Sequence, residues 1–391
     1  MSNLTFVRRG PAVVAGLIMV AVAVARPSEP LLMSPPAARA FVNSLVTWDD
    51  HGVLAWYGGA LQANVIHLQR LDTGLEVYGR PVALTDPTRE AYEPSLARDM
   101  RHLLVAWYEK GLPSADFYVQ VAMVDWSAQV KWHGVLSHAG RSGRNPVVRA
   151  APDGAWVAWL ESEDAERMDV WVEHLSAAGQ PLAQAQRAGE ADRDTAHLNA
   201  AVDATGVFYV VFDARLASRA RELQLLTVDG SNARQHTLTH DDAAASVFPD
   251  IAIEGDRVAL CWVDARDGHA AVRTAVGTRA LLDKELDAHA VALTRASNQV
   301  GGSYLAWNRG QLAVAWNETG AGAGVFLQRV DGRGRPTGAP LRVAHTTAPA
   351  QAAVPSVAAW HKGFALVWNE YTEDRTAHRV ISSTALRATV P

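Results

Sequence analysis

Apolar residues occur along this chain in short runs separated by polar turns, and the runs that end in an aromatic residue recur at a nearly constant spacing. The run V-L-A-W ends at Trp56, and A-L-V-W ends at Trp368. The complete set of these aromatic positions is Trp56, Trp107, Trp159, Phe212, Trp262, Trp316 and Trp368. Neighbouring members lie 50 to 54 residues apart, so the sequence predicts seven copies of one structural unit.

A second set of positions keeps the same register. Thirteen residues before each aromatic stand Asn43, Pro94, Pro146, Asn199, Pro249, Ser303 and Pro355. These residue types are typical of turns and of the start of a strand. A short apolar segment follows each of them, and turn signals such as Pro152-Asp153-Gly154 separate it from the aromatic run. Each unit therefore opens with a predicted β-hairpin.

The second half of each unit adds two further strands. Alternating segments begin at Asn64, Asp169 and Gly324, and a shorter segment follows a glycine-containing turn, as at Arg80 and Ala290. Four short antiparallel strands repeated seven times predict an all-β fold, a seven-bladed β-propeller. No amphipathic helical pattern competes with this prediction.

The two ends of the chain are expected to meet in one blade. Residues 30–34 precede Asn43 by the interval at which the outer strand at 81–85 precedes Pro94. The last unit, after Trp368, has little chain left for a fourth strand. We therefore predict that residues 30–34 supply the outer strand of the C-terminal blade and close the ring without an unpaired edge.

The first 25 residues differ from the rest. Arg8 and Arg9 precede an uncharged apolar run from Ala12 to Ala25, which ends in small residues before Arg26-Pro27. This pattern predicts a signal peptide over 1–25 and a single propeller domain over 26–391, located in the periplasm or secreted. The alternative is an uncleaved anchor, but 14 apolar residues fall short of the ~20 that span a bilayer. After cleavage we expect no membrane insertion.

Charge and cysteine content limit the kinds of partner and of covalent bond that we expect for this chain. The net charge is -5 with no long run of one sign, so a nucleic-acid partner is not expected. The single cysteine, Cys261, excludes an internal disulfide. Its equivalents in the other units are Ala or Val, so we predict a small buried position and not a reactive thiol. We expect a monomer.

Two short motifs carry a resemblance to known proteins. The tetrads at Pro94-Ser95-Leu96-Ala97 and Pro355-Ser356-Val357-Ala358, together with W-x-[DE], resemble repeats of exported bacterial seven-bladed propellers that are loosely termed sialidase-like. The resemblance covers nearly the whole chain after the signal peptide and implies a blade but no reaction. The sialidase aspartate box, the kelch glycine doublets and the Trp-Asp ending of tryptophan-aspartate repeats are absent from the sequence.

Acidic residues form a column in the register of the repeat. Two positions after the aromatic come Glu109, Glu161, Asp264, Glu318 and Glu370, and in the fourth unit Asp213 stands one position earlier. The end of a second strand and the start of a first strand lie at the same rim of a propeller, so these acids are expected beside the inter-blade loops. The loops carry candidate ligand-binding bases at Arg89, Arg141, Arg144 and Arg295, with Arg39, Arg193, His138, His240 and His345 also nearby in the sequence.

Two interpretations of this rim stay open. Carboxylates and guanidinium groups together can bind a protein or a polar ligand such as a glycan. Alternatively, each acid accepts hydrogen bonds from backbone amides of the following turn and stabilises the blade. Trp48, Trp307 and Trp360, near the hairpin turns, are expected to pack, with sugar stacking or partner binding as the alternative.

No motif identifies a reaction. The 14 histidines show no metal-ligand spacing, and phosphate, dinucleotide and nucleophile motifs are missing from the sequence, so we expect no metal and no cofactor. The first hypothesis is a noncatalytic exported propeller that binds a protein or polar ligand on the acidic rim. The alternative is a glycan-processing hydrolase or lyase with a central site, which needs two carboxyls about 5 to 9 Å apart. A third reading is a structural component of the cell envelope.

Overall fold

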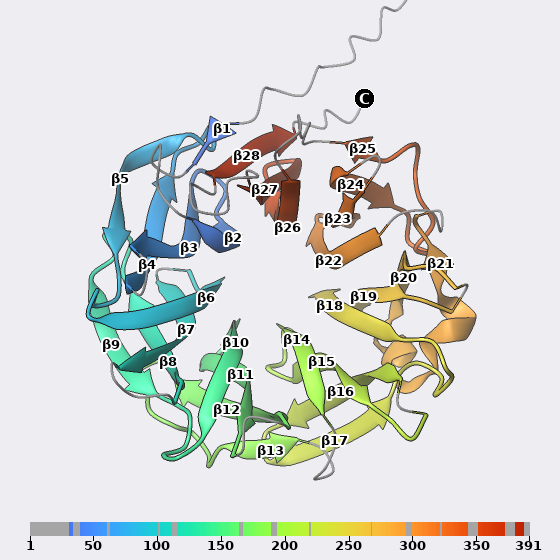
Figure 1. The fold of residues 1–391 in the computed structure, drawn as a ribbon, viewed down its shortest axis with the longest axis horizontal. Coiled ribbons are helices and arrows are strands. Elements are labelled where there is room, and N and C mark those ends of the chain that lie inside the picture. Colours follow the sequence, from blue (N-terminus) through green and yellow to red (C-terminus); the bar gives the residue numbers. More distant parts are fainter. Residues whose placement is uncertain are drawn as a thin grey trace, which may run out of the picture.

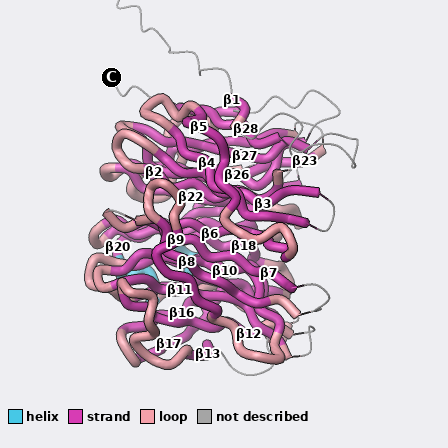
Figure 2. Tube along the Cα trace, turned by 90° about the vertical axis from the view of Figure 1, so that its left-hand side faces the viewer, coloured by secondary structure: helices cyan, strands magenta, loops and turns pink. Residues whose placement is uncertain are grey.

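The computed structural model describes residues 31–33, 40–60, 63–100, 102–111, 116–163, 167–188, 194–218, 220–266, 268–294, 299–320, 323–342, 351–371 and 380–386. Strands form nearly all the regular structure of this part of the chain, arranged as a ring of sheets around a central channel (Figure 1). The chain is a β-propeller of four-stranded antiparallel blades. Figure 2 shows the ring from the side, with loops gathered along its rims.

The first four sheets follow one another in chain order. From the channel outward they are β2 Phe41–Thr47, β3 Gly52–Ala60, β4 Ala63–Leu71 and β5 Val77–Ala83; β6 Arg89–Arg98, β7 Leu103–Gly111, β8 Tyr118–Val124 and β9 Val130–Val135; β10 Ser142–Ala151, β11 Gly154–Ser162, β12 Asp169–Ser176 and β13 Gln186–Ala188; β14 Thr195–Val202, β15 Phe208–Arg215, β16 Arg221–Asp229 and β17 Asn232–Thr237.

The remaining sheets complete the ring. They are β18 Ser246–Glu254, β19 Arg257–Asp264, β20 Ala271–Thr278 and β21 Val291–Ala292; β22 Gln299–Asn308, β23 Gln311–Thr319, β24 Gly324–Val330 and β25 Leu341–Arg342; and β26 Gln351–Trp360, β27 Gly363–Tyr371, β28 Val380–Leu386 and β1 Leu31–Leu32. Two short 3-10 helices, η1 Arg279–Asp283 and η2 Leu286–His289, lie between β20 and β21.

Six of these sheets are blades, and the β22–β25 sheet is described only in part. Its outer strand β25 has two residues, and residues 295–298, 321–322 and 343–350, which flank or interrupt the sheet, lie outside the described part of the chain. The described strands thus form six blades and this partial seventh sheet.

The core lies between neighbouring sheets. The second strand of a sheet is buried on both faces, as in β11, where every residue after Gly154 is buried. The outer strand alternates between exposed and half-buried residues, as in β9. Trp159, 0% exposed, packs with Val121 and Val148 of the two sheets that meet there. Burial of such apolar surface contributes about 25 cal/mol per Å² and holds the sheets together.

A β-bulge interrupts each innermost strand. The pairing register shifts at this point in all seven first hairpins. The non-glycine residues with positive φ there are Val42 (34°), Glu93 (47°), Asn145 (50°), His197 (30°), Phe248 (55°) and Val354 (51°). The repeated Pro, Asn or Ser landmark thus lies inside the strand, beside the bulge, and its assignment to the start of a strand was wrong. A proline fits there because the bulge needs no ladder donor.

The chain ends pair in the sheet of β26, β27 and β28. Leu31 pairs with Ser383 and Leu32 with Ser382, which is the pairing that the sequence predicts for residues 30–34. Met33 is 1% exposed and packs in a cluster with Trp56 of β3 and Trp360 of β26. Residues 1–25, the predicted signal peptide, lie outside the described residues, within which no helix is long and apolar enough to cross a membrane.

Serines that directly follow the repeat landmark connect neighbouring sheets around the channel; Ser95 and Ser356 belong to the P-S-x-A motif, and Ser44 stands in the tetrad N-S-L-V. Each serine hydroxyl accepts a hydrogen bond from a backbone amide of the next innermost strand: Leu96 N to Ser44 Oγ at 3.0 Å, Val148 N to Ser95 Oγ at 3.2 Å and Leu45 N to Ser356 Oγ at 3.2 Å. Asp250 replaces serine between β18 and β22, with Leu305 N donating to its Oδ2 at 2.8 Å. The motif is therefore an inter-sheet contact.

Candidate functional site at the channel mouth

The acids of the column accept hydrogen bonds from the aromatic residue two positions earlier. The indole N–H donates to the carboxylate in each pair: Trp107 to Glu109 at 2.9 Å, Trp159 to Glu161 at 2.9 Å, Trp262 to Asp264 at 3.2 Å, Trp316 to Glu318 at 2.9 Å and Trp368 to Glu370 at 3.1 Å. Glu370 is half-buried and the other four are buried. A buried indole needs an acceptor, and the acid supplies it.

Bases from the neighbouring loops contact the same carboxylates. Arg89 Nε lies 2.9 Å from Glu109 Oε1. His138 Nδ1 lies 2.8 Å from Glu161 Oε1, and its backbone N donates to Oε2 at 3.1 Å. Arg141 Nε lies 3.7 Å from Glu161 Oε1, and Arg141 also pairs with Glu163. Three of the bases expected at this rim, Arg89, His138 and Arg141, therefore lie against predicted acids.

Asp264 has the densest set of partners. Arg266 donates to it from Nε at 2.9 Å, from Nη2 at 2.6 Å and from its backbone N at 2.9 Å, and also pairs with Asp287. Burial opposes ionisation of Asp264, but the hydrogen bonds from Arg266 and Trp262 outweigh it and lower the pKa of this carboxyl. The hydrogen bond from the backbone N of Arg266 to Asp264 is the contact between an acid and the following turn that the structural interpretation of the column predicts.

Asp213 points to a different set of groups. The side chain of Phe212 has no N–H to donate, and Asp213 stands one position earlier than the other acids. Arg221 donates to its Oδ1 at 3.0 Å, while His197 Nδ1, at 2.9 Å, and Phe248 N, at 3.2 Å, contact Oδ2. Asp213 thus joins its own sheet to the bulge of the next innermost strand.

These contacts favour the structural interpretation of the column. Each buried carboxylate two positions after a tryptophan accepts from that indole, and those of Glu109, Glu161 and Asp264 also pair with a base. Of the remaining predicted site residues, Arg144 extends over the ring of Phe117, 4.7 Å from the centroid. Arg295, like Arg39, Arg193 and His345, lies outside the described residues. The column does not bring two exposed carboxyls together in the described part of the chain.

The same rim carries a row of aromatic side chains that was not predicted from the sequence. The aromatic row comprises Phe41, Tyr57, Tyr92, Tyr108 and Phe117, with successive ring centroids 5.1, 5.3, 5.4 and 5.4 Å apart. All five side chains are half-buried. Lys110 Nζ lies 5.4 Å from the centroid of Phe117, the ring that Arg144 also contacts. Two cations and five rings therefore form one continuous surface.

Hydrogen bonds orient the row. Tyr92 donates its hydroxyl proton to Glu90 at 2.8 Å, and Lys110 pairs with Glu90 at 3.0 Å. Burial raises the pKa of the Tyr92 and Tyr108 hydroxyls, so both remain neutral donors. The sequence signal was available: Tyr57 and Tyr108 directly follow an aromatic anchor.

Bulge residues line the mouth of the channel beside the row. Asn145 donates to Glu93 Oε2, and the His197 ring lies 3.8 Å from that of Phe248. Burial raises the pKa of Glu93, opposed by the charges of His197 and Arg144. The channel below has a volume of about 620 Å³. Glu93, with its elevated pKa at an open mouth, is the carboxyl of this rim best suited to meet a ligand.

A half-buried arginine and a buried aspartate lie deeper in the channel wall. Arg149 donates to Ala200 O at 2.7 Å and to Asn199 Oδ1 at 2.5 Å, joining β10 to β14. Burial raises the pKa of Asp250 to about 6, against the hydrogen bond from Leu305 N and the charge of Arg149. Both side chains have partners in the adjacent sheet, which assigns them a structural role.

Metal and thiol chemistry find no support in the described residues. In that part of the chain, no three His, Cys, Asp or Glu side chains are grouped to hold a metal ion. Cys261 is 0% exposed and packs with Ala259 and Trp316, and burial raises its thiol pKa well above the usual value. The prediction of a small buried position for Cys261 is confirmed.

Comparison with solved structures places the chain among propellers. The beta-propeller domain of the Trilobed protease from Pyrococcus furiosus matches with a TM-score of 0.52 and 11% identity over 89% of this chain and 93% of that one. A puromycin-hydrolyzing peptidase of Mycobacterium tuberculosis matches with a TM-score of 0.53 and 14% identity over 86% of this chain. A Hadza microbial sialidase matches with a TM-score of 0.49 and 10% identity over 85% of this chain and 75% of that one.

These similarities show the fold alone, because sequence identity is low and propellers carry many activities. The chain spans about half of the larger peptidases, covering 52% of the puromycin-hydrolyzing peptidase and 50% of a prolyl endopeptidase. No protein-family model and no curated protein sequence matches the chain. The propeller fold expected from the sequence is thereby confirmed.

Proposed function

We propose that this chain is an exported, noncatalytic propeller that binds a glycan or a segment of a protein partner on the rim of inter-blade loops and second-strand ends. The observation that carries the proposal is the aromatic row, which presents half-buried rings beside Glu93, Lys110 and Arg144. Ring faces stack on sugars or aromatic side chains, and the charged groups fix polar atoms of the ligand.

Export is the second part of the proposal. It rests on Arg8-Arg9, the apolar run and the small residues that precede Arg26. A cleaved signal over 1–25 would leave the propeller in the periplasm or outside the cell, where the ligands of such a rim would be envelope glycans or envelope proteins.

Seven blades form the third part. We count the β22–β25 sheet as a blade because β22 lies between β18 and β26 in the ring, and β26 in turn lies beside β2. The hydrogen bond from Leu45 N to Ser356 Oγ repeats between β2 and β26 the contact found between β2 and β6. With β1 as its outer strand, the C-terminal blade would then close a seven-membered ring.

Binding is favoured over catalysis by the state of the carboxylates. Four column acids are buried against indoles, and Glu90 is paired with Lys110 and Tyr92. A hydrolase needs one carboxyl as acid and a second, accessible one as nucleophile or base. Glu93 fits the first role and is the specific observation that favours the alternative, a glycan-processing hydrolase or lyase.

The aromatic row can be tested with a glycan array and immobilised peptides, followed by affinity measurement for each hit. Phe117→Ala and Arg144→Ala are expected to weaken binding at least 10-fold, because they remove one ring and its cation. Glu318→Gln with Glu370→Gln, which alters the column outside the two sheets that carry the row, should leave affinity within twofold. The opposite result, loss in the column variant alone, would return ligand contact to the column acids.

Hydrolysis is tested separately. The protein is expected to release no sugar from the glycans it binds, and Glu93→Gln should change affinity without changing the products in solution. Release of sugar that disappears in Glu93→Gln would instead establish the hydrolase or lyase.

A further inference from the structure

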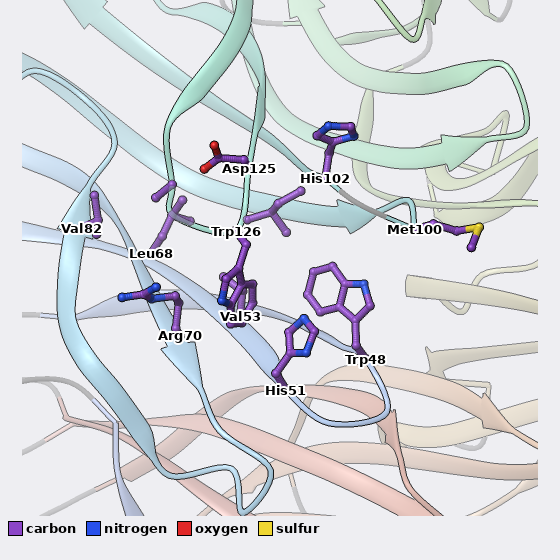
Figure 3. A pocket seen from close by; sticks show the side chains of 12 residues that line it. Trp48, His51, Val53, Leu68, Arg70, Val82, Met100, His102, Asp125 and Trp126 are labelled. Atoms are coloured by element: carbon purple, nitrogen blue, oxygen red, sulfur yellow. The ribbon is translucent and has the colours of Figure 1, made fainter.

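A second pocket lies on the opposite rim, between the β2–β5 and β6–β9 sheets (Figure 3). Its volume is about 230 Å³, and its residues come from three turns: Trp48 and His51 at the β2–β3 turn, Met100 and His102 at the β6–β7 turn, and Trp126 at the β8–β9 turn. Strands alternate direction, so these turns lie at the rim away from the column of acids. Neither the repeat nor the aromatic row accounts for this pocket.

The pocket walls are mainly apolar and aromatic. Val53, Leu68, Val82, Leu103 and Ala128 line it together with the two indoles. Trp48 stacks on His51 with centroids 4.6 Å apart, and Trp126 meets both rings edge-on, at 5.8 and 4.1 Å. Trp126 remains 36% exposed. An empty apolar cavity of about 150 Å³ is enough to bind benzene, so this one has room for a substituted ring.

The polar groups of the lining offer very few acceptors. Asp125 Oδ1 already accepts from Ser127 and Gln129, and Lys131 pairs with its Oδ2 at 2.7 Å. His51 Nδ1 lies 2.5 Å from Asp50 Oδ1, and His102 Nδ1 lies 3.2 Å from Asp99 Oδ2. No hydrogen bond to either Nε2 is present within the described residues. With Nδ1–H donating to the carboxylate, each Nε2 is left as an acceptor.

Charges of both signs, Arg70 and Asp125, lie in the lining, so neither a cation nor an anion meets charges of one sign only. Arg70 and Arg98 already lie over the rings of Trp126 and Trp48, 6.0 and 5.0 Å from the centroids, and would repel a cation at those faces. Asp50 and Asp99, which hold the histidines, would repel an anion. A sugar would leave most of its hydroxyls unpaired against apolar walls. The lining therefore matches a neutral ring with one hydroxyl.

We propose that this pocket binds a neutral aromatic ring that carries one hydroxyl group, with the ring against Trp126 and the hydroxyl donating to Nε2 of His51 or His102. The chemistry is that of a phenol, and its source is either a free phenolic molecule or a tyrosine side chain. This site is independent of the ligand proposed for the aromatic row.

The test is calorimetric titration of the purified chain with p-cresol, toluene, methyl β-glucoside and N-acetyltyrosinamide. We expect p-cresol to bind at least 10-fold more tightly than toluene and than methyl β-glucoside. N-acetyltyrosinamide that matches p-cresol would assign the site to a tyrosine side chain, whereas binding of p-cresol alone would assign it to a free phenol. Tighter binding of the glucoside or of toluene overturns the proposal.

Variants locate the site. Trp126→Ala is expected to weaken p-cresol binding at least 10-fold, and Trp126→Leu, which keeps more of the packing, should do the same if the alanine variant melts early. The matched control is Trp307→Ala, a half-buried indole beneath Arg257, which should stay within twofold. His51→Phe and His102→Phe, made singly, should include one that removes the preference for p-cresol over toluene. Unchanged affinity in both Trp126 variants, or an unchanged preference in both histidine variants, contradicts the assignment.

Discussion

Trp159 and Glu161 stand two positions apart in β11, so both side chains leave the same face of the strand. That geometry follows from the sequence once the strand is recognised, and the indole could have been named as the donor. The column of acids was found because it recurs in register. The aromatic row was missed because Tyr57, Tyr92 and Tyr108 belong to the first two units only, and a search for a seven-fold pattern passes over a local surface.

Glu222 is the residue whose titration should govern stability near neutral pH. It is 1% exposed, accepts from Thr239 Oγ1 at 2.7 Å, and burial raises its pKa to about 7. The folded protein binds the Glu222 proton more tightly than the unfolded chain. The contribution of this carboxyl to the free energy of unfolding is therefore complete below about pH 4.5 and is lost as the pH rises through 7.

Glu222→Gln should therefore stabilise the protein at pH 8 by at least about 1 kcal/mol and change it little at pH 4.5. Urea unfolding at several pH values measures this difference. The unfolding free energy of the variant should still fall somewhat with rising pH, because Asp250, with its pKa raised to about 6, acts in the same direction. If the unfolding free energy of the variant depends on pH as strongly as that of the parent, ionisation of Glu222 does not destabilise the fold.

At the scale of the element, the bulge in each innermost strand was not predicted. Sequence alone indicated a special backbone position, since Pro, Asn and Ser recur there, but turn and bulge share these residues. The bulge arises from the way the first strand pairs with the second, and no local sequence pattern indicates that pairing. Val354 shows that the bulge costs conformational energy, because a β-branched residue at a φ of 51° is strained.

Val354→Asn should raise the free energy of unfolding by about 1 kcal/mol, since asparagine tolerates this conformation and Asn145 occupies the equivalent bulge. Equilibrium urea unfolding provides the measurement. Val357→Asn, in the same strand and packed against a core cluster, is the contrasting control and should destabilise. Equal losses in both variants would mean that Val354 is held by packing rather than strained.

At the scale of the whole molecule, the repeat predicted the propeller and the pairing of residues 30–34 with the last sheet. The channel-mouth surface and the pocket at the other rim could not be predicted, because each brings together loops and turns of different units. Their side chains are neighbours only after the sheets have packed around the channel.

Met33 tests how much the N-terminal segment contributes to the ring. Its side chain is buried between the first and last sheets, so Met33→Ala should lower the free energy of unfolding by about 2–5 kcal/mol. Met100→Ala, 91% exposed, is the control and should have almost no effect. Deletion of residues 27–36 should lower the melting temperature further than Met33→Ala. A deletion variant that melts with the parent would remove β1 from the account of ring stability.

The antiparallel pairing of β1 with β28 also sets the mechanical behaviour of the ring. Leu31 faces Ser383, so the N-terminal end of β1 and the C-terminal side of β28 lie at the same end of the pair. A force applied at the two chain ends would peel these strands apart one contact at a time instead of sliding them past each other. The propeller would open at this seam under load while its other blades, joined by continuous chain, stay intact.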